Sequence, residues 1–253
     1  MAASETQGVS IDIRALRKSF GGVPVLRGVD LHVDPGEIMV IVGGSGEGKS
    51  VLLRHIAGLE TADQGSIRLN GMDLQEYLRL PVGEKPFRLS MVFQSSALFN
   101  SLTVAENVSL RLKEHHTHPP HEIQQIVARC LEQVELAGTE NKMPSDLSGG
   151  MRKRVAIARA LAAEPQIILY DEPTADLDPI LTEQIGQLVK RIQETRRTTQ
   201  VIVAHNVALA GRIGTHIAVL HQGRIVDFQP ANALSRSDNP HTQEFIKAAN
   251  LSL

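Results

Sequence analysis

Gly43-Gly44-Ser45-Gly46-Glu47-Gly48-Lys49-Ser50 is the most informative segment of this chain. It fits the pattern G-x-x-x-x-G-K-[ST] at every fixed position, directly after the apolar run 38–42. That run predicts a buried strand, and residues 49–58 show helical spacing. A strand, a glycine-rich loop and a helix in this order predict a phosphate-binding site, because loop amides and a helix N-terminus attract anions.

The positions of this loop have distinct predicted roles. The glycines let backbone N–H groups curl around phosphates, Lys49 reaches the β- and γ-phosphates of a nucleotide, and Ser50 ligates Mg²⁺. Glu47 brings a negative charge, so we expect its side chain to point into solvent or toward a basic partner. The predicted nucleotide contacts of the loop are Gly43, Gly44, Ser45, Gly46, Glu47, Gly48, Lys49, Ser50 and Val51.

Two acidic residues follow the short apolar run 167–170, which predicts a second buried strand. Asp171 is expected to face the metal and Glu172 to polarise the attacking water. Taken alone, the pair equally fits a solvated helix start. The phosphate loop upstream favours the catalytic interpretation, because ligands of α/β sheets bind at the carboxyl ends of strands.

Leu147-Ser148-Gly149-Gly150-Met151 begins a predicted helix over residues 151–163 and can offer backbone donors to phosphate. This segment resembles the signature motif of the ABC ATPases. Phe20, Gln94, residues 175–178 and His205 also fall where that family places its aromatic residue, Q-loop, D-loop and switch histidine. The resemblance extends over about residues 10–230, and the motifs occur in the family's order.

The resemblance implies further roles by position. Phe20 would stack on adenine, Gln94 would sense Mg²⁺ or the water and link the site to a permease, and His205 would hold the γ-phosphate. Ser148, Gly149 and Gly150 would act on the ATP bound by the opposite protomer of a homodimer. In isolation, Phe20, Gln94 and His205 better fit a core aromatic, a turn amide and a strand-end histidine, but their occurrence together favours the roles that the resemblance implies.

Four positions depart from the family pattern: Val51 for threonine, Met151 for glutamine, Asp176 for glycine and Asn206 for aspartate. None of them removes a principal catalytic group. Val51 lacks one hydroxyl that could bond phosphate, an effect of about 0.5–1.5 kcal/mol. Val51→Thr is therefore expected to tighten ATP binding.

The remaining periodicity predicts an α/β fold with a parallel-sheet core, an antiparallel β flank and a helical insertion. The resemblance implies that this fold is a P-loop NTPase of ABC type, with a RecA-like core and a helical subdomain. We expect one domain over residues 1–253. Its ATPase core comprises residues 10–94 and 164–230, the helical subdomain about 95–163, and a helical tail 231–253. Short β-rich runs separated by Gly21-Gly22 and Asp34-Pro35-Gly36 predict the antiparallel flank.

Composition excludes several classes of protein. Lys and Arg total 26 against 28 Asp and Glu, so no global basic field exists to hold nucleic acid. The single cysteine, Cys130, is expected to be a small core residue.

No run of eighteen apolar residues occurs and residues 1–10 lack a signal-peptide pattern. If the chain serves transport, the pore belongs to a separate permease.

Two clusters of basic or imidazole side chains have alternative interpretations. The stretch 115–121 holds His115, His116, His118 and His121, but its prolines favour a solvated connector over a metal site. Residues 152–154, Arg-Lys-Arg, favour a helix face over a nucleic-acid patch.

Residues 93–99 and 143–151 resemble the ATPases of bacterial MCE-type, Mla-like phospholipid transporters. That resemblance implies lipid cargo, an MCE-domain partner, an accessory cytosolic subunit and a place on the cytoplasmic face of the inner membrane. An amino-acid or other small-solute importer shares nearly all the motifs and stays open. A nucleic-acid ABC machine would need a long coiled coil or tandem cassettes, which the chain lacks. An idle scaffold is disfavoured because Lys49, Asp171, Glu172 and His205 are all present.

Overall fold

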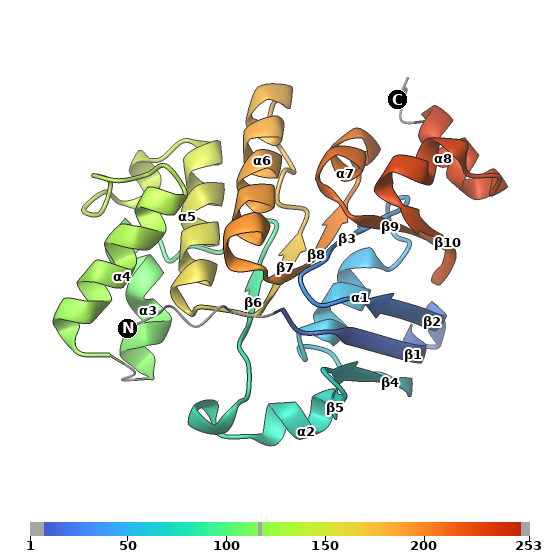
Figure 1. Ribbon diagram of the computed structural model, residues 1–253, viewed down its shortest axis with the longest axis horizontal. Helices are drawn as coiled ribbons and strands as arrows, with labels where there is room; N and C mark the ends of the chain where they lie inside the picture. Colours follow the sequence, from blue (N-terminus) through green and yellow to red (C-terminus); the bar gives the residue numbers. More distant parts are fainter. Residues whose placement is uncertain (1–7, 116–117, 249–253) are drawn as a thin grey trace.

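The computed structural model describes residues 8–115 and 118–248, and two sheets form its frame (Figure 1). The antiparallel sheet has the strand order β2-β1-β4-β5. Its strands are β1 (Ile11–Phe20), β2 (Val23–Val33), β4 (Gln64–Leu69) and β5 (Met72–Asp73).

The second sheet has the order β10-β9-β3-β8-β7-β6, and all its neighbours are parallel except β10 and β9. Its strands are β3 (Ile38–Val42), β6 (Leu89–Val92), β7 (Ile167–Asp171), β8 (Thr199–Ala204), β9 (His216–His221) and β10 (Arg224–Pro230). The predicted α/β class, with a parallel core and an antiparallel flank, is confirmed.

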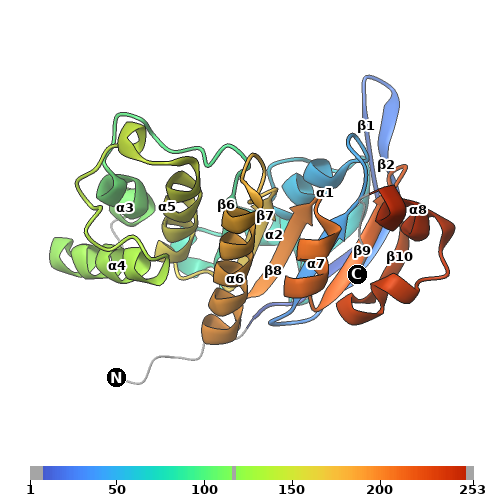
Figure 2. The same cartoon turned by 90° about the horizontal axis from the view of Figure 1, so that it is seen from above.

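The central strands are apolar throughout because both faces of the sheet are covered. In β3, Val40 and Val42 join a core with helices α6 (Pro179–Arg196) and α7 (Val207–Ile213). Met39 and Ile41 face the other way, into a core shared with α1 (Lys49–Ile56) and the antiparallel sheet. Figure 2 shows α6 and α7 together on one side of the sheet.

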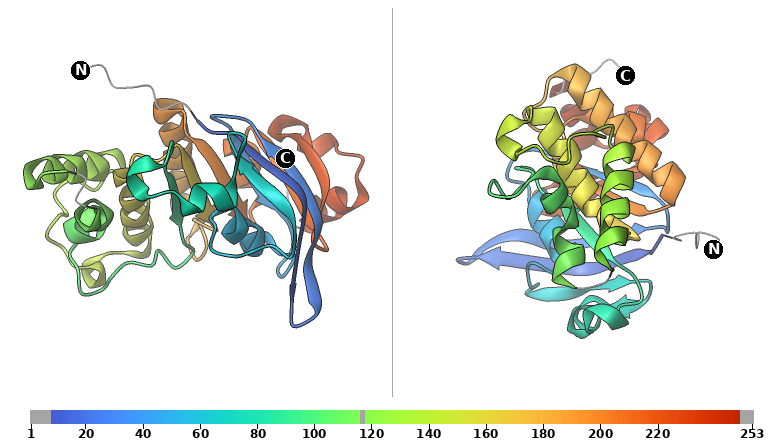
Figure 3. Two further views of the ribbon diagram at one scale, coloured as in Figure 1. Left: turned by 90° about the horizontal axis from the view of Figure 1, so that it is seen from below. Right: turned by 90° about the vertical axis from the view of Figure 1, so that its left-hand side faces the viewer.

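Three helices gather at the end of the molecule away from β9 and β10: α3 (Val104–Glu114), α4 (Pro120–Gln133) and α5 (Gly149–Ala162) (Figures 1 and 3). A capping box of Thr103 and Glu106 fixes the start of α3, and the Ser148 side chain caps α5. Helix α5 contacts both α3 and α4. Cys130 of α4 is buried in this core, as predicted, and burial raises the pKa of its thiol.

Several short elements were not predicted. Asp73 caps α2 (Leu74–Arg79), which is too short to show helical periodicity in the sequence. The 3₁₀ turns are η1 (Val82–Glu84), η2 (Pro144–Asp146) and η3 (Ala231–Arg236), and α8 (Pro240–Ala248) follows η3. The last two belong to the predicted helical tail 231–253, whose first part is therefore 3₁₀ and not α-helical. No helix in the described part of the chain has the length and apolar character needed to cross a bilayer.

Candidate functional site

Residues 43–48 connect β3 to α1 and wrap around the side chain of Lys49. The Lys49 ammonium donates hydrogen bonds to the carbonyls of Gly43 (3.0 Å) and Gly44 (2.7 Å), and the residue is only 4% exposed. Gly48, which precedes α1, has φ +99°, a conformation that favours glycine. The loop therefore holds the Lys49 ammonium at the N-terminus of α1. An anion there is stabilised both by the ammonium and by the helix N-terminus.

Burial lowers the pKa of Lys49 below its ordinary value, while Glu172, Glu47 and Asp171 oppose that shift through their negative charges. A phosphate group beside the ammonium would act in the same direction as these carboxylates. The site therefore favours an anionic ligand next to Lys49.

Asp171 brings a carboxylate to the phosphate loop from the end of β7. Its Oδ1 accepts a hydrogen bond of 2.7 Å from the Ser50 hydroxyl, and Asp171 is 5% exposed. The carboxyl ends of β3 and β7 lie at one edge of the sheet because β8 pairs in parallel with both. Hydroxyl and carboxylate oxygens are ligands that Mg²⁺ prefers, so this pair fits the predicted metal site.

Glu172 and His205 form the next contact. Oε1 of Glu172 lies 2.6 Å from Nε2 of His205, whose Nδ1 is 3.5 Å from the Lys49 ammonium. Glu172 has φ +46°, an unusual conformation for a residue with a side chain, and its N–H donates to the Val203 carbonyl (3.0 Å). The neighbouring strand thus fixes the backbone that aims the carboxylate at the histidine.

The structure brings together the residues that phosphoryl transfer to water requires. A cation lies at the phosphate loop, hard oxygens for a metal lie beside it, and a carboxylate and an imidazole lie next to both. Five predicted residues share this cluster: Lys49, Ser50, Asp171, Glu172 and His205.

Ser148, Gly149 and Gly150 lie elsewhere. The Ser148 hydroxyl accepts a hydrogen bond from the N–H of Met151 (3.3 Å), and both Ser148 and Gly149 are exposed. Within residues 8–115 and 118–248, no hydrogen bond or ion pair joins this helix start to the Lys49 cluster. Met151, the departure from glutamine, packs against the apolar core.

Phe20 and Gln94 are also outside the cluster. The Phe20 ring, at the end of β1, is 44% exposed and lies 5.0 Å from the Lys18 ammonium. Gln94 is exposed, and its backbone carbonyl accepts a hydrogen bond from Lys153. Among the described residues, Gln94 has no bond to Ser50 or Asp171, so its predicted metal contact stays a prediction.

Other loop predictions have clear structural counterparts. The Glu47 carboxylate contacts His221 and the backbone N–H of Gln222, so it points toward a basic partner.

Val51 is half-buried and packs against the second core. Asp176 has φ +64°, which explains why a glycine is common there. Asn206 caps α7 by accepting the N–H of Leu209 (2.9 Å).

Sequence reasoning missed the cations that hold residues 94–97. Lys153 is buried and Arg159 half-buried; both project from α5 and donate to backbone carbonyls of this loop. Arg154 is buried too and bonds the Val134 carbonyl (3.0 Å) and Glu135 (2.5 Å). The sequence signal that could have revealed them is the presence of Lys and Arg on a helix with many apolar residues, which indicates that some of these cations face inward. Residues 152–154 are a helix face, but much of it turns inward.

The histidine stretch shows no metal site in the part that the structure covers. No group of three or more His, Cys, Asp or Glu side chains there is arranged to hold an ion. His116 and Thr117 lie outside the described residues.

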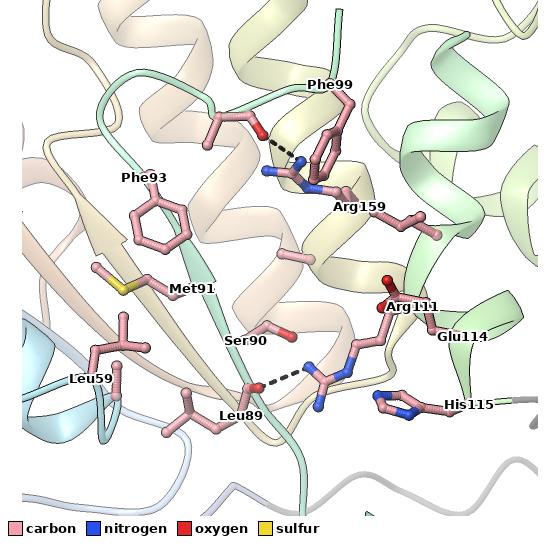
Figure 4. A pocket seen from close by; sticks show the side chains of 14 residues that line it. Leu59, Leu89, Ser90, Met91, Phe93, Phe99, Arg111, Glu114, His115 and Arg159 are labelled. Atoms are coloured by element: carbon pink, nitrogen blue, oxygen red, sulfur yellow. Dashed lines mark hydrogen bonds between the residues drawn. The ribbon is translucent and has the colours of Figure 1, made fainter. Parts of the chain in front are cut away.

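A groove of about 560 Å³ lies beside the loop that contains Gln94 (Figure 4). Apolar side chains of Leu59, Met91, Phe93 and Phe99 line it. Arg111 crosses its floor and donates to the Leu89 carbonyl (3.2 Å).

Comparisons with known proteins agree with this geometry. The family model described as ABC transporter matches residues 26–175. "Probable ribonucleotide transport ATP-binding protein mkl" of Mycobacterium leprae is 38% identical over 96% of this chain and 70% of its own length. "Protein TRIGALACTOSYLDIACYLGLYCEROL 3, chloroplastic" of Arabidopsis thaliana is 36% identical over 94% of this chain and 73% of its own.

A solved structure extends the likeness to three dimensions. It is a dimeric, post-hydrolysis state of an ATP-binding cassette bound to ADP and Pi, with a TM-score of 0.77 and 33% identity, and the match covers 88% of this chain and 99% of that one. The phosphate loop, the buried acids and these matches lead to one conclusion: the chain belongs to the ABC transporter family as an ATP-binding subunit, and it is an ATPase.

Proposed function

We propose that two copies of this chain bind two ATP molecules between them and drive a separate membrane permease. The observation that carries the proposal is the exposed start of α5, which lies apart from the Lys49 cluster of its own chain. A helix N-terminus is suited to bind phosphate, and Ser148 and Gly149 are exposed there, whereas Gly150 is buried. In a two-fold pair it would face the phosphate loop of the partner copy, and the dimeric relative supports such a pair.

Each residue of the cluster has a role in the proposed reaction. Lys49 and the amides of residues 43–48 bind the phosphates, and Phe20 stacks on adenine. Glu172 orients the attacking water and accepts its proton, while His205 holds the γ-phosphate. Bound Mg²⁺ would be held by Ser50 and Asp171, with Gln94 near it, and would neutralise phosphate charge.

Mixing two inactive variants tests the shared site. Lys49→Ala removes the phosphate cation, and Ser148→Arg blocks the helix start, so each variant alone should be inactive. In a mixed pair, one of the two sites combines an intact Lys49 with an intact Ser148. ATPase activity should therefore reappear on mixing, at up to half the parental rate per mixed pair. No recovery from mixed pairs that demonstrably form would contradict a site built across two copies.

The groove beside Gln94 is the proposed contact for the permease. Its lining is mainly apolar, with Arg111 and Arg159 among the exceptions. It lies at the loop held by Lys153 and Arg159, which joins the core to the helical subdomain. A movement of residues 94–97 on ATP binding would reach a protein segment seated there. Attachment through such a permease would place the chain on the cytoplasmic face of the inner membrane.

Phospholipid is the proposed cargo. The proposed partners, besides the permease, are an MCE-domain protein and an accessory cytosolic subunit. The resemblance of residues 93–99 and 143–151 supports it, and the plant relative is named after a galactolipid. Small-solute import is the second candidate, because the mycobacterial relative is named for ribonucleotide transport.

Purifying the complex from native membrane separates the two candidates. Phospholipid bound in stoichiometric amount and an MCE-domain protein in the complex are expected for lipid transport. ATPase activity stimulated by a small solute, without bound lipid, would favour the second.

A further inference from the structure

Glu47 stands inside the phosphate loop, yet its carboxylate is bound by another part of the chain. Its Oε2 accepts the backbone N–H of Gln222, and its Oε1 lies 3.2 Å from Nδ1 of His221. The His221 ring therefore lies within ion-pair distance of the Glu47 carboxylate, next to the backbone N–H that Glu47 accepts. Both partners lie where β9 turns into β10, so the turn draws the Glu47 charge toward itself.

The loop and this turn are also packed closely along their backbones. A Cβ built on Gly43 would lie 2.2 Å from the Leu220 carbonyl oxygen, so only glycine fits there. The position of the loop therefore depends on the position of the end of β9.

The C-terminal helix contacts the same turn. The ring of His241, in the first turn of α8, stacks on the ring of His221 with centroids 4.3 Å apart and an interplanar angle of 27°. Asp227 of β10 anchors this helix start, because its carboxylate accepts the hydroxyls of Thr242 (2.7 Å) and Ser237. Figure 1 shows α8 above β9 and β10 at one end of the molecule.

We infer that Glu47 and His221 are positioning residues through which helix α8 sets the affinity of the phosphate loop for nucleotide. The path runs from Asp227 to α8, from His241 to His221, and from His221 to Glu47. A loop held in one arrangement before binding loses less conformational freedom on binding, so release of this path weakens nucleotide. The inference rests on the proposed binding of nucleotide by residues 43–51.

Calorimetric titration of the purified chain with Mg²⁺-ADP tests the path without turnover. Glu47→Gln keeps an acceptor for the Gln222 N–H, whereas Glu47→Ala removes it. Loss of one hydrogen bond predicts binding about 2–10-fold weaker for Glu47→Ala than for Glu47→Gln. Equal affinities of these two variants would overturn the role of Glu47.

The decisive step is a double-mutant cycle with the exposed His241. His241→Ala should weaken ADP about 2–5-fold, and His241→Phe, which keeps a stacked ring, should restore most of that loss. In the Glu47→Ala background, His241→Ala should have no further effect, because the path is already broken. His121→Ala, on the exposed surface of α4, is the matched control and should bind like the parent.

The inference would be overturned if His241→Ala bound ADP with parental affinity. It would also be overturned if the loss of affinity in the double variant equalled the product of the losses in Glu47→Ala and His241→Ala. A failure of the proposed function would give a different result. The parental chain would then not bind ADP, or Lys49→Ala would bind ADP as tightly as the parent does.

Discussion

Glu172 is held in its unusual backbone conformation by the bond from its N–H to Val203, and its carboxylate meets His205 at 2.6 Å. Glu172→Gln preserves the shape and a contact to the imidazole but removes the proton acceptor. ATP turnover should fall by about 10²–10⁴-fold while ATP stays bound. Single-turnover hydrolysis and size-exclusion chromatography measure the rate and the expected ATP-loaded pair. Turnover at the parental rate would remove Glu172 from this role.

Residue identities and spacing predicted most of the cluster. Lys49, Ser50, Asp171, Glu172 and His205 lie close together. The loop motif pointed to Lys49 and Ser50, the apolar run 167–170 to Asp171 and Glu172, and the family resemblance to His205. The partners of Glu47 were beyond prediction, because His221 is 174 positions away in the chain and its pairing arises only from the packing of β9 beside β3.

At the scale of elements, α5 pins the loop that follows β6. Arg159 donates to the carbonyls of Ala97 (2.6 Å) and Ser96 (2.8 Å), and burial lowers the pKa of its guanidinium. Ser96 and Ala97 have φ of +64° and +46°, which costs conformational energy that these bonds offset.

Arg159→Ala should therefore release residues 95–99. We expect faster amide exchange there and a loss of about 1–3 kcal/mol in the free energy of unfolding. Arg159→Lys should restore little, since one ammonium does not reproduce the planar fork that serves two carbonyls. Hydrogen exchange and urea denaturation measure both effects, with Arg129→Ala on the exposed face of α4 as control. Unchanged exchange at residues 95–99 would contradict this assignment.

At the scale of the whole molecule, Asp227 ties the C-terminal segment to the parallel sheet. Burial raises the pKa of its carboxyl, but hydrogen bonds from Ser237, Thr242 and Gln229 outweigh it, so the pKa in the folded state lies below the ordinary value. The ionised form thus stabilises the fold at pH values above the unfolded pKa of about 4, and this contribution is lost as the pH falls through the folded pKa.

Asp227→Asn should lower the free energy of unfolding by about 1 kcal/mol at pH 7. The difference from the parent should shrink as the pH falls below 4 and through the folded pKa of Asp227, because the parental carboxyl then becomes protonated and loses its charge. Urea denaturation at pH 7 and near pH 3 checks this. A difference independent of pH would mean that shape, and not the charge of Asp227, holds the segment.

The parallel core, the phosphate loop and the acids after β7 were predictable from local sequence. Each depends on local periodicity and on the rule that parallel strands deliver residues to one edge of a sheet. Tertiary structure alone decided three other things. It turned Lys153 and Arg159 inward, bound Glu47 to the turn after β9, and set α8 against that turn. These contacts join residues that are far apart in the chain. They arise only when the elements pack together, so no local sequence pattern predicts them.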